Sequence, residues 1–197
     1  AAYSAALDSG GLTLASVQDD APYTYAGANG KSVNNYDRRY RGFTTLREAI
    51  TDSINIVTVK TLAQAGVSLG WQYVQEYGFT TVDSRDMNEA LALGGITQGV
   101  SNLELTAAYA AIANQGTYIK PKFYTKILDH DGNVLIDNTT PESHTVIKDT
   151  TAWLLTSAME DVMTSGTGTS AYFGSSMAQA GKSGTTTSSR DALFAGY

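Results

Sequence analysis

The chain has 197 residues, 42% of them hydrophobic, enough for one core or at most two small ones. Its formal net charge of −6, without a basic cluster, argues against binding to nucleic acid or to an anionic membrane. The absence of cysteine excludes disulfides, thiol catalysis and cysteine-ligated metals, and the two histidines, His130 and His144, lie in polar, loop-like surroundings. We therefore expect any enzymatic activity to need neither histidine nor a metal.

The chain opens inside an apolar helix. Residues 1–7 have helical composition and are closed by the turn residues 8–11. A domain seldom begins so deep inside such a helix, so we expect an upstream segment to be missing. Residues 19–42 are polar and rich in tyrosine, and they predict a long loop of the kind that packs across a cleft.

Capping residues and apolar spacing predict the remaining helices. Thr45 with Glu48 and Ser101 with Glu104 match capping boxes, and one helix breaks at residues 53–55. Helices are expected from Leu46 to that break and again over 57–66, and from Leu69 to Tyr77 with Ser68 as the cap. Two more are expected from Ser101 to Gly116 and from the cap Asp149 to residue 165. One face of the last helix is expected to be buried, with Ala152, Trp153, Leu155, Met159 and Val162.

Strand-like composition marks residues 117–128, 133–137, 181–187 and 192–197. The turn 129–132 joins the first two stretches into a hairpin. Neither an internal repeat nor a linker interrupts the chain. The sequence therefore predicts one domain of mixed helix and strand content.

The strongest chemical signal is Lys182-Ser183-Gly184-Thr185 in an extended context. Lys182 supplies positive charge, the hydroxyls of Ser183 and Thr185 are directed donors, and Gly184 lets a ligand lie close to the backbone. This pattern is typical of a carboxylate-binding surface, although a plain surface hairpin has the same composition. A phosphate-binding loop fits poorly, because its first glycine falls on Ser176 and the motif must open a helix.

The second signal is Ser53-Ile54-Asn55 at the predicted helix break. Ser53 could relay a proton and Asn55 could hold an amide, although capping the next helix is the ordinary role of such residues. The two signals together are specific. S-x-N followed by K-[TS]-G-T gives, in order, two of the three motifs shared by β-lactamases and penicillin-binding proteins.

Longer stretches extend this likeness over nearly the whole chain. TLREAITDSINIVTVK (45–60), ALALGGITQGVSNLELTAAYAAIANQGTYIKP (90–121), AGKSGTTTSSRDALFAGY (180–197) and the tyrosine-rich segments 22–25 and 36–38 resemble the transpeptidase domain of a class A, bifunctional penicillin-binding protein. The resemblance implies an α+β fold of the penicillin-binding protein and β-lactamase type, with an antiparallel sheet packed between helices. Residues 1–197 would be part of that single domain.

The first motif of the family, S-x-x-K, is missing. None of the seven lysines has a serine three residues before it. In the family this motif begins the helix that residues 1–7 resemble, so we expect it to lie just upstream, and we expect the family's last strands to follow Tyr197.

The resemblance also implies a mechanism without cofactors. The missing serine would attack the penultimate D-Ala carbonyl of a peptidoglycan stem peptide, and β-lactams would trap it as an acyl-enzyme. Ser53 would relay a proton, Lys182 would support that relay, and Asn55 would bind the substrate amide. Ser183 and Thr185 would hold the terminal carboxylate, and the backbone N–H of Thr185 would help form the oxyanion hole.

Three functions remain open from the sequence. The first is a D,D-transpeptidase at the outer face of the cytoplasmic membrane, of which these 197 residues alone do not acylate because they lack the nucleophile. The second is a non-catalytic module that binds peptidoglycan or β-lactams, and the third is β-lactam hydrolysis. Each would use the stem peptide or a β-lactam as partner and none would use nucleic acid.

Overall fold

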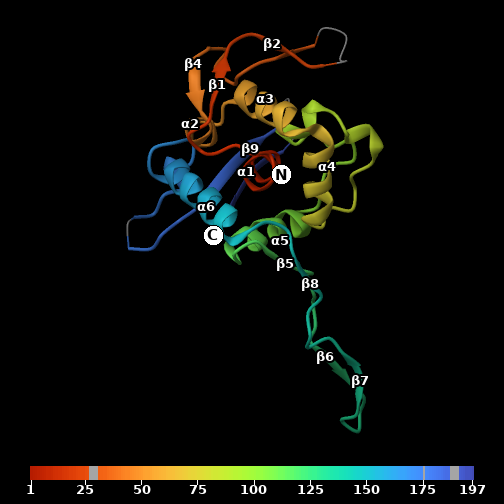
Figure 1. The fold of residues 1–197 in the computed structure, drawn as a ribbon. Coiled ribbons are helices and arrows are strands. Elements are labelled where there is room, and N and C mark those ends of the chain that lie inside the picture. The colour runs from red at the N-terminus through yellow and green to blue at the C-terminus, as the bar shows by residue number, and fades with distance from the viewer. Residues whose placement is uncertain (27–30, 175, 187–190) are drawn as a thin grey trace.

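The computed structural model describes residues 1–26, 31–174, 176–186 and 191–197. Its α-helices are α1 (Ala2–Asp8), α2 (Leu46–Thr51), α3 (Asn55–Ala65), α4 (Val67–Glu76), α5 (Asn102–Ala113) and α6 (Asp149–Thr164). Short 3₁₀ helices are η1 (Ser84–Asp86), η2 (Glu89–Leu93) and η3 (Thr169–Ala171). Helix α1 lies at the centre, with α3, α4, α5 and α6 arranged around it (Figure 1).

Small side chains allow α1 to occupy the centre. Ala5 and Ala6 are fully buried, and Ser4 is nearly so. Because these residues are small, α3, α4 and α6 can approach the helix closely and contact it. The hydroxyl of Ser4 lies 2.9 Å from the hydroxyl of Tyr77, so this buried polar group has a hydrogen-bond partner. The helix expected for residues 1–7 is thus confirmed, and its position at the centre of the core is a finding of the structure.

The strands form antiparallel two-stranded ladders. They are β1 (Val17–Asp20) with β4 (Gly42–Thr45), β2 (Tyr23–Thr24) with β3 (Ser32–Val33), β5 (Thr117–Ile119) with β8 (Ser143–Thr145), β6 (Lys126–Leu128) with β7 (Val134–Asp137), and β9 (Gly181–Thr185) with β10 (Ala192–Gly196). Helix α6 contacts β9 and α5 contacts β10, so this ladder lies between helices. The predicted α+β class is confirmed.

The long loop predicted for residues 19–42 is wrong in part, because β2 and β3 lie inside it and β1 and β4 enter its ends. A buried carboxylate folds the segment back on itself. Asp20 accepts bonds of 2.8 and 3.0 Å from the side-chain amide of Asn35 and one of 2.9 Å from the backbone N–H of Arg41. The sequence did not reveal these contacts, because the segment is polar throughout and the bonded residues lie 15 and 21 positions apart. Residues 27–30 of the segment lie outside the described residues.

Both predicted capping boxes are confirmed, at α2 and at α5. The cap expected at Ser68 is wrong, because α4 begins at Val67 and Gly66 occupies the cap position with a φ of 106°. Asp149 is the first residue of α6 rather than its cap, and its carboxylate accepts the N–H of Thr150 at 2.7 Å.

Trp153 does not share the buried face of α6. Its side chain is 68% exposed, whereas Ala152, Leu155 and Val162 are buried as expected. One helical residue corresponds to a rotation of about 100°, so a position directly after Ala152 turns away from the 152–155–162 stripe. The stripe is therefore aliphatic, and the indole of Trp153 faces solvent.

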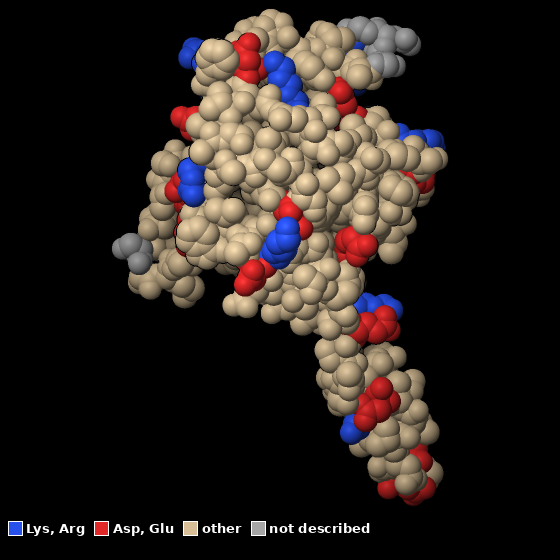
Figure 2. Space-filling model, in the orientation of Figure 1, with Lys and Arg blue, Asp and Glu red and all other residues tan. Residues whose placement is uncertain are grey.

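The predicted hairpin over residues 117–137 is confirmed for β6 and β7 and forms an arm that projects from the body (Figures 1 and 2). Asp129 stabilises its turn by accepting the N–H groups of Asp131 and Asn133 at 2.9 and 2.8 Å. β5 pairs instead with β8, at the base of the arm. Within the described part of the chain, no helix combines the length and the apolar character that a bilayer crossing demands.

Candidate functional site

The S-x-N tripeptide forms the sharp turn between α2 and α3. Ser53 has a φ of 56°, in the left-handed region, which costs a non-glycine residue about 1 kcal/mol. Ile54 is almost fully buried and packs with Leu46, Ala49 and Val57, so its side chain fixes the turn to the hydrophobic core. Ser53 and Asn55, on either side of this anchor, both line a cavity of about 600 Å³.

Strand β9 brings Lys182 to the same cavity. The ammonium Nζ of Lys182 donates a 2.8 Å hydrogen bond to Oγ of Ser53, although 129 residues separate the two along the chain. Nζ also lies 3.3 Å from the carbonyl oxygen of Ser183. Burial lowers the pKa of Lys182 from its usual 10.5 to about 8, because desolvation disfavours the charged form. The Lys182 side chain is therefore still mostly protonated at neutral pH, but it is a stronger acid than an ordinary lysine.

The remaining residues of the K-S-G-T motif line the cavity too. Ser183, Gly184 and Thr185 all belong to its wall. A side chain added at Gly184 would meet no other atom within 4 Å, so open space lies beside the backbone there. The expected strand is confirmed by the pairing of β9 with β10, which also excludes the helix that a phosphate-binding loop would need. Thr187, at the end of the predicted strand, lies outside the described residues.

Asn55 is oriented by the segment that precedes β4. Its side-chain Nδ2 donates to the carbonyl oxygen of Asn34 at 2.9 Å, which leaves the amide oxygen Oδ1 as the free end. The neighbouring Asn35 accepts the N–H of Ile56 at 3.2 Å through its own Oδ1 and bonds Asp20 through Nδ2. Asn35 thus ties this segment to the first turn of α3.

Sequence reasoning missed several residues of this cavity. From the segment before β4 come Tyr36, Asp37 and Arg41, and Tyr36 is almost fully exposed. From the turn after α6 comes Thr167, whose Oγ1 lies 3.3 Å from Oγ of Ser183. Tyr36 and Asp37 entered the sequence argument only as part of a resemblance, and the segment around Thr167 only as a helix end.

The first residues of the chain form another wall of the cavity. Ala1, Ala2, Tyr3 and Ser4 all line it. Helix α1 therefore lies beside the bond between Lys182 and Ser53.

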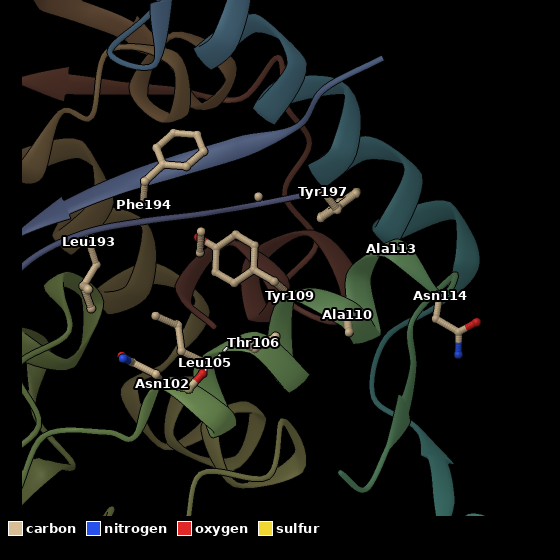
Figure 3. A pocket seen from close by; sticks show the side chains of 12 residues that line it. Asn102, Leu105, Thr106, Tyr109, Ala110, Ala113, Asn114, Leu193, Phe194 and Tyr197 are labelled. Atoms are coloured by element: carbon tan, nitrogen blue, oxygen red, sulfur yellow. Dashed lines mark hydrogen bonds between the residues drawn. The ribbon is translucent and has the colours of Figure 1, made fainter. Parts of the chain in front are cut away.

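A second groove, of about 650 Å³, runs between α5 and β10 (Figure 3). The ring of Tyr109 lies on its floor, with Leu105 on the same helix and Leu193 and Phe194 on the strand. Burial raises the pKa of Tyr109 to about 12, so its hydroxyl stays protonated. None of the residues singled out from the sequence lines this groove, although Tyr109 also reaches the first cavity.

The two histidines lie away from both cavities. The ring of His144 packs at a tilt of 38° against the ring of Tyr118, with centroids 5.2 Å apart, and its Nε2 lies 2.8 Å from the carbonyl oxygen of Glu76. His130 is exposed at the tip of the arm and faces Asp131. Among the described residues, no group of three or more histidine or acidic side chains gathers as a metal site would require.

Comparison with known proteins gives a consistent result. A family model described as the penicillin-binding protein transpeptidase domain matches residues 1–193. Penicillin-binding protein 1F of Bacillus subtilis is 39% identical over 169 residues, which cover 83% of this chain and 23% of that protein. Penicillin-binding protein 1A of Neisseria meningitidis is 33% identical over 206 residues, which cover 99% of this chain and 25% of that protein.

Solved structures show the same likeness. The crystal structure of penicillin-binding protein 1A from Haemophilus influenzae aligns with a TM-score of 0.87 at 28% identity, covering 100% of this chain and 34% of that one. The chain thus spans about a quarter of the length of these curated relatives. With the two motifs meeting in one cavity and the family model matching almost throughout, the chain belongs to the penicillin-binding protein transpeptidase family.

Proposed function

We propose that these residues form most of the acyl-transfer site of a peptidoglycan D,D-transpeptidase, which β-lactams also acylate. The observation that carries the proposal is the 2.8 Å bond from Lys182 to Ser53, inside a cavity that Asn55 and the K-S-G-T strand share. An ammonium, hydroxyls and a side-chain amide around one cavity suit a peptide that ends in D-Ala-D-Ala, because it offers amides and a terminal carboxylate.

The bond between Lys182 and Ser53 favours a proton relay. A lysine ammonium can only donate, so Oγ of Ser53 must accept, and the hydroxyl proton of Ser53 is directed elsewhere. That proton can pass to the leaving D-Ala nitrogen, and a proton from the incoming amine can replace it. The positive charge of Lys182 stabilises the oxygen while it is between the two states.

The other predicted residues bind and polarise the substrate. Asn55, held by the Asn34 carbonyl, presents Oδ1 to a substrate amide N–H. Ser183 and Thr185 hold the terminal carboxylate, and Gly184 leaves room for the peptide to lie along β9. The backbone N–H of Thr185 serves as one donor of the oxyanion hole, a contribution of roughly 3 kcal/mol in other acyl-transfer enzymes.

The nucleophile is proposed to come from an S-x-x-K segment immediately before Ala1. Ala1 lines the same cavity as Ser53 and Lys182, so a residue that precedes it would lie close to these groups. The 197 residues alone are expected not to acylate, and a second polypeptide that supplies the segment would restore the site. The last strands of the family would continue the sheet from β10, beside the second groove.

Related proteins support the β-lactam part of the proposal. The PonA1 protein of Mycobacterium tuberculosis, solved in complex with penicillin V, has the same fold, with a TM-score of 0.74 and 23% identity over 100% of this chain. The outer face of the cytoplasmic membrane, where peptidoglycan is assembled, is the proposed location. The proposed partners are the stem peptide and β-lactams.

Labelling with fluorescent penicillin tests the proposal. The protein is extended upstream through S-x-x-K and downstream through the last strands, labelled, and analysed by mass spectrometry. A covalent adduct on a serine just before Ala1 is expected, and Lys182→Ala should reduce its rate of formation sharply. Absence of an adduct in a folded protein would instead favour the second candidate, a non-catalytic module that binds peptidoglycan or β-lactams. Rapid turnover of a chromogenic β-lactam would favour the third, hydrolysis.

A further inference from the structure

The turn that follows α6 joins two walls of the cavity. The backbone N–H of Thr167 donates to the carbonyl oxygen of Thr51, 3.2 Å away, just before the Ser53 turn. Gly166 packs so tightly there that an added Cβ would collide with the same oxygen, and a Cβ at Gly168 would lie 3.0 Å from the carbonyl oxygen of Val162. Thr167 is therefore held in place by backbone contacts on either side, independently of its own side chain.

The side chain of Thr167 extends from this fixed backbone into the cavity. It is exposed and lines the same space as Ser53, Lys182 and Ser183. Its Oγ1 lies 3.3 Å from Oγ of Ser183, which is long for a hydrogen bond between hydroxyls, whose usual distance is about 2.8 Å. The contact is weak, so a ligand oxygen can replace it at little cost.

Two hydroxyls in weak contact are suited to an anion. Each hydroxyl has one proton to donate, and at most one of the two protons is used in the bond between Thr167 and Ser183. A carboxylate placed against both oxygens can accept both protons, and hydrogen bonds to a charged acceptor are about twice as strong as neutral ones. The ammonium of Lys182, bonded to Ser53 on the same wall, adds a favourable field.

We propose that Thr167 is a further carboxylate-binding residue, acting opposite Ser183 in the site that receives the substrate's C-terminal carboxylate. This inference rests on the proposed function. It adds a donor from the α6 turn to those of β9, so the carboxylate is held between two separate elements of the fold.

Binding of small peptides provides the test. The affinity of the protein for N-acetyl-D-Ala-D-Ala and for its C-terminal amide is measured by NMR titration in the unchanged chain and in four variants. Thr167→Val removes the hydroxyl with little change of shape, Thr167→Ser keeps it, and Ser183→Ala removes a donor already proposed. Thr169→Val is the matched control, since Thr169 is an exposed threonine two residues along and does not line the cavity.

We expect Thr167→Val to weaken binding of the acid at least about tenfold, the loss of one hydrogen bond to a charged group. Binding of the amide should change less than about twofold, because that ligand carries no charge at this end. Thr167→Ser and Thr169→Val should keep the preference of the unchanged chain for the acid.

Each other outcome has a definite meaning. If Ser183→Ala loses the preference for the acid while Thr167→Val retains it, the role of Thr167 is refuted and the proposed function stands. If Thr167→Val weakens acid and amide equally, the residue is structural and the inference fails. If the unchanged chain does not prefer the acid, the carboxylate site itself is refuted, together with the proposed function.

Discussion

The buried ammonium of Lys182 should make the protein less stable than a variant without it. Replacement by methionine, Lys182→Met, keeps an unbranched side chain of nearly the same length and removes the charge. The pKa of Lys182 falls from 10.5 to about 8 on folding, a shift of about 2.5 units. At 1.36 kcal/mol for each unit, folding with a charged Lys182 costs about 3 kcal/mol.

The sign of the pH dependence follows from the lowered pKa. Below pH 8 the side chain is charged in both states, so the full cost opposes folding. Between pH 8 and 10.5 the folded protein loses this proton before the unfolded chain does, and the cost disappears. The stability advantage of Lys182→Met should therefore shrink by roughly 2.5 kcal/mol between pH 7 and pH 10. Loss of the bond to Ser53 lowers the advantage at every pH but not its slope.

Urea denaturation of the two proteins, followed by tryptophan fluorescence across this pH range, measures the difference. All other charged groups are the same in the two proteins, so their contributions to the free energy of unfolding largely cancel in the difference. Leu69→Met, at a partly buried apolar position away from the cavity, controls for the introduction of methionine. If the difference in free energy of unfolding between Lys182→Met and the unchanged protein does not vary between pH 7 and pH 10, burial of this charge does not cost stability and the reasoning is refuted.

Three further substitutions test contacts that hold the fold together, each by urea denaturation. Asn35→Ala leaves the buried carboxylate of Asp20 without its side-chain donor and should lower the free energy of unfolding by about 2–3 kcal/mol. A loss below about 1 kcal/mol would contradict a stabilising role for this pair of hydrogen bonds. Gly116 has a φ of 87°, and an added Cβ would collide with the carbonyl oxygen of Ile147, whereas Gly132 has a φ of 85° in open space. Gly116→Ala should therefore lower the free energy of unfolding clearly more than Gly132→Ala does, and equal losses would contradict this reasoning. Thr45→Ala removes the capping box of α2 and should lower the free energy of unfolding by about 1 kcal/mol. An unchanged free energy of unfolding would show that this cap does not contribute to stability.

Local interactions account for what could be predicted from the sequence. The capping boxes at Thr45 and Ser101 involve residues three apart, so their pattern is visible in the chain itself. The hairpin turn at residues 129–132 is equally local. The two motifs of the site were readable because each is a short run, and the resemblance to a family supplied the expectation that they meet.

Contacts between distant segments account for what could not be predicted. Asp20 and Asn35 look like ordinary turn formers in a polar stretch, yet they build a buried clamp beside α3. Thr167 follows a helix end of simple composition, and only the packing of Gly166 on Thr51 brings it to Ser183. Neither arrangement leaves a periodic or spaced pattern, because each depends on which elements pack together.

The features that oppose folding gather at one place in this fold. Ser53 adopts a left-handed backbone conformation and Lys182 buries a charge, and their side chains bond to each other. Selection for stability alone would favour glycine at the first position and an apolar residue at the second. Their joint presence in one cavity agrees with the proposed proton relay, which needs the Ser53 hydroxyl beside a cation. For this reason Lys182→Met should stabilise the fold and also sharply slow acylation of the protein extended through S-x-x-K, whereas replacing a purely structural lysine would change stability without changing the chemistry.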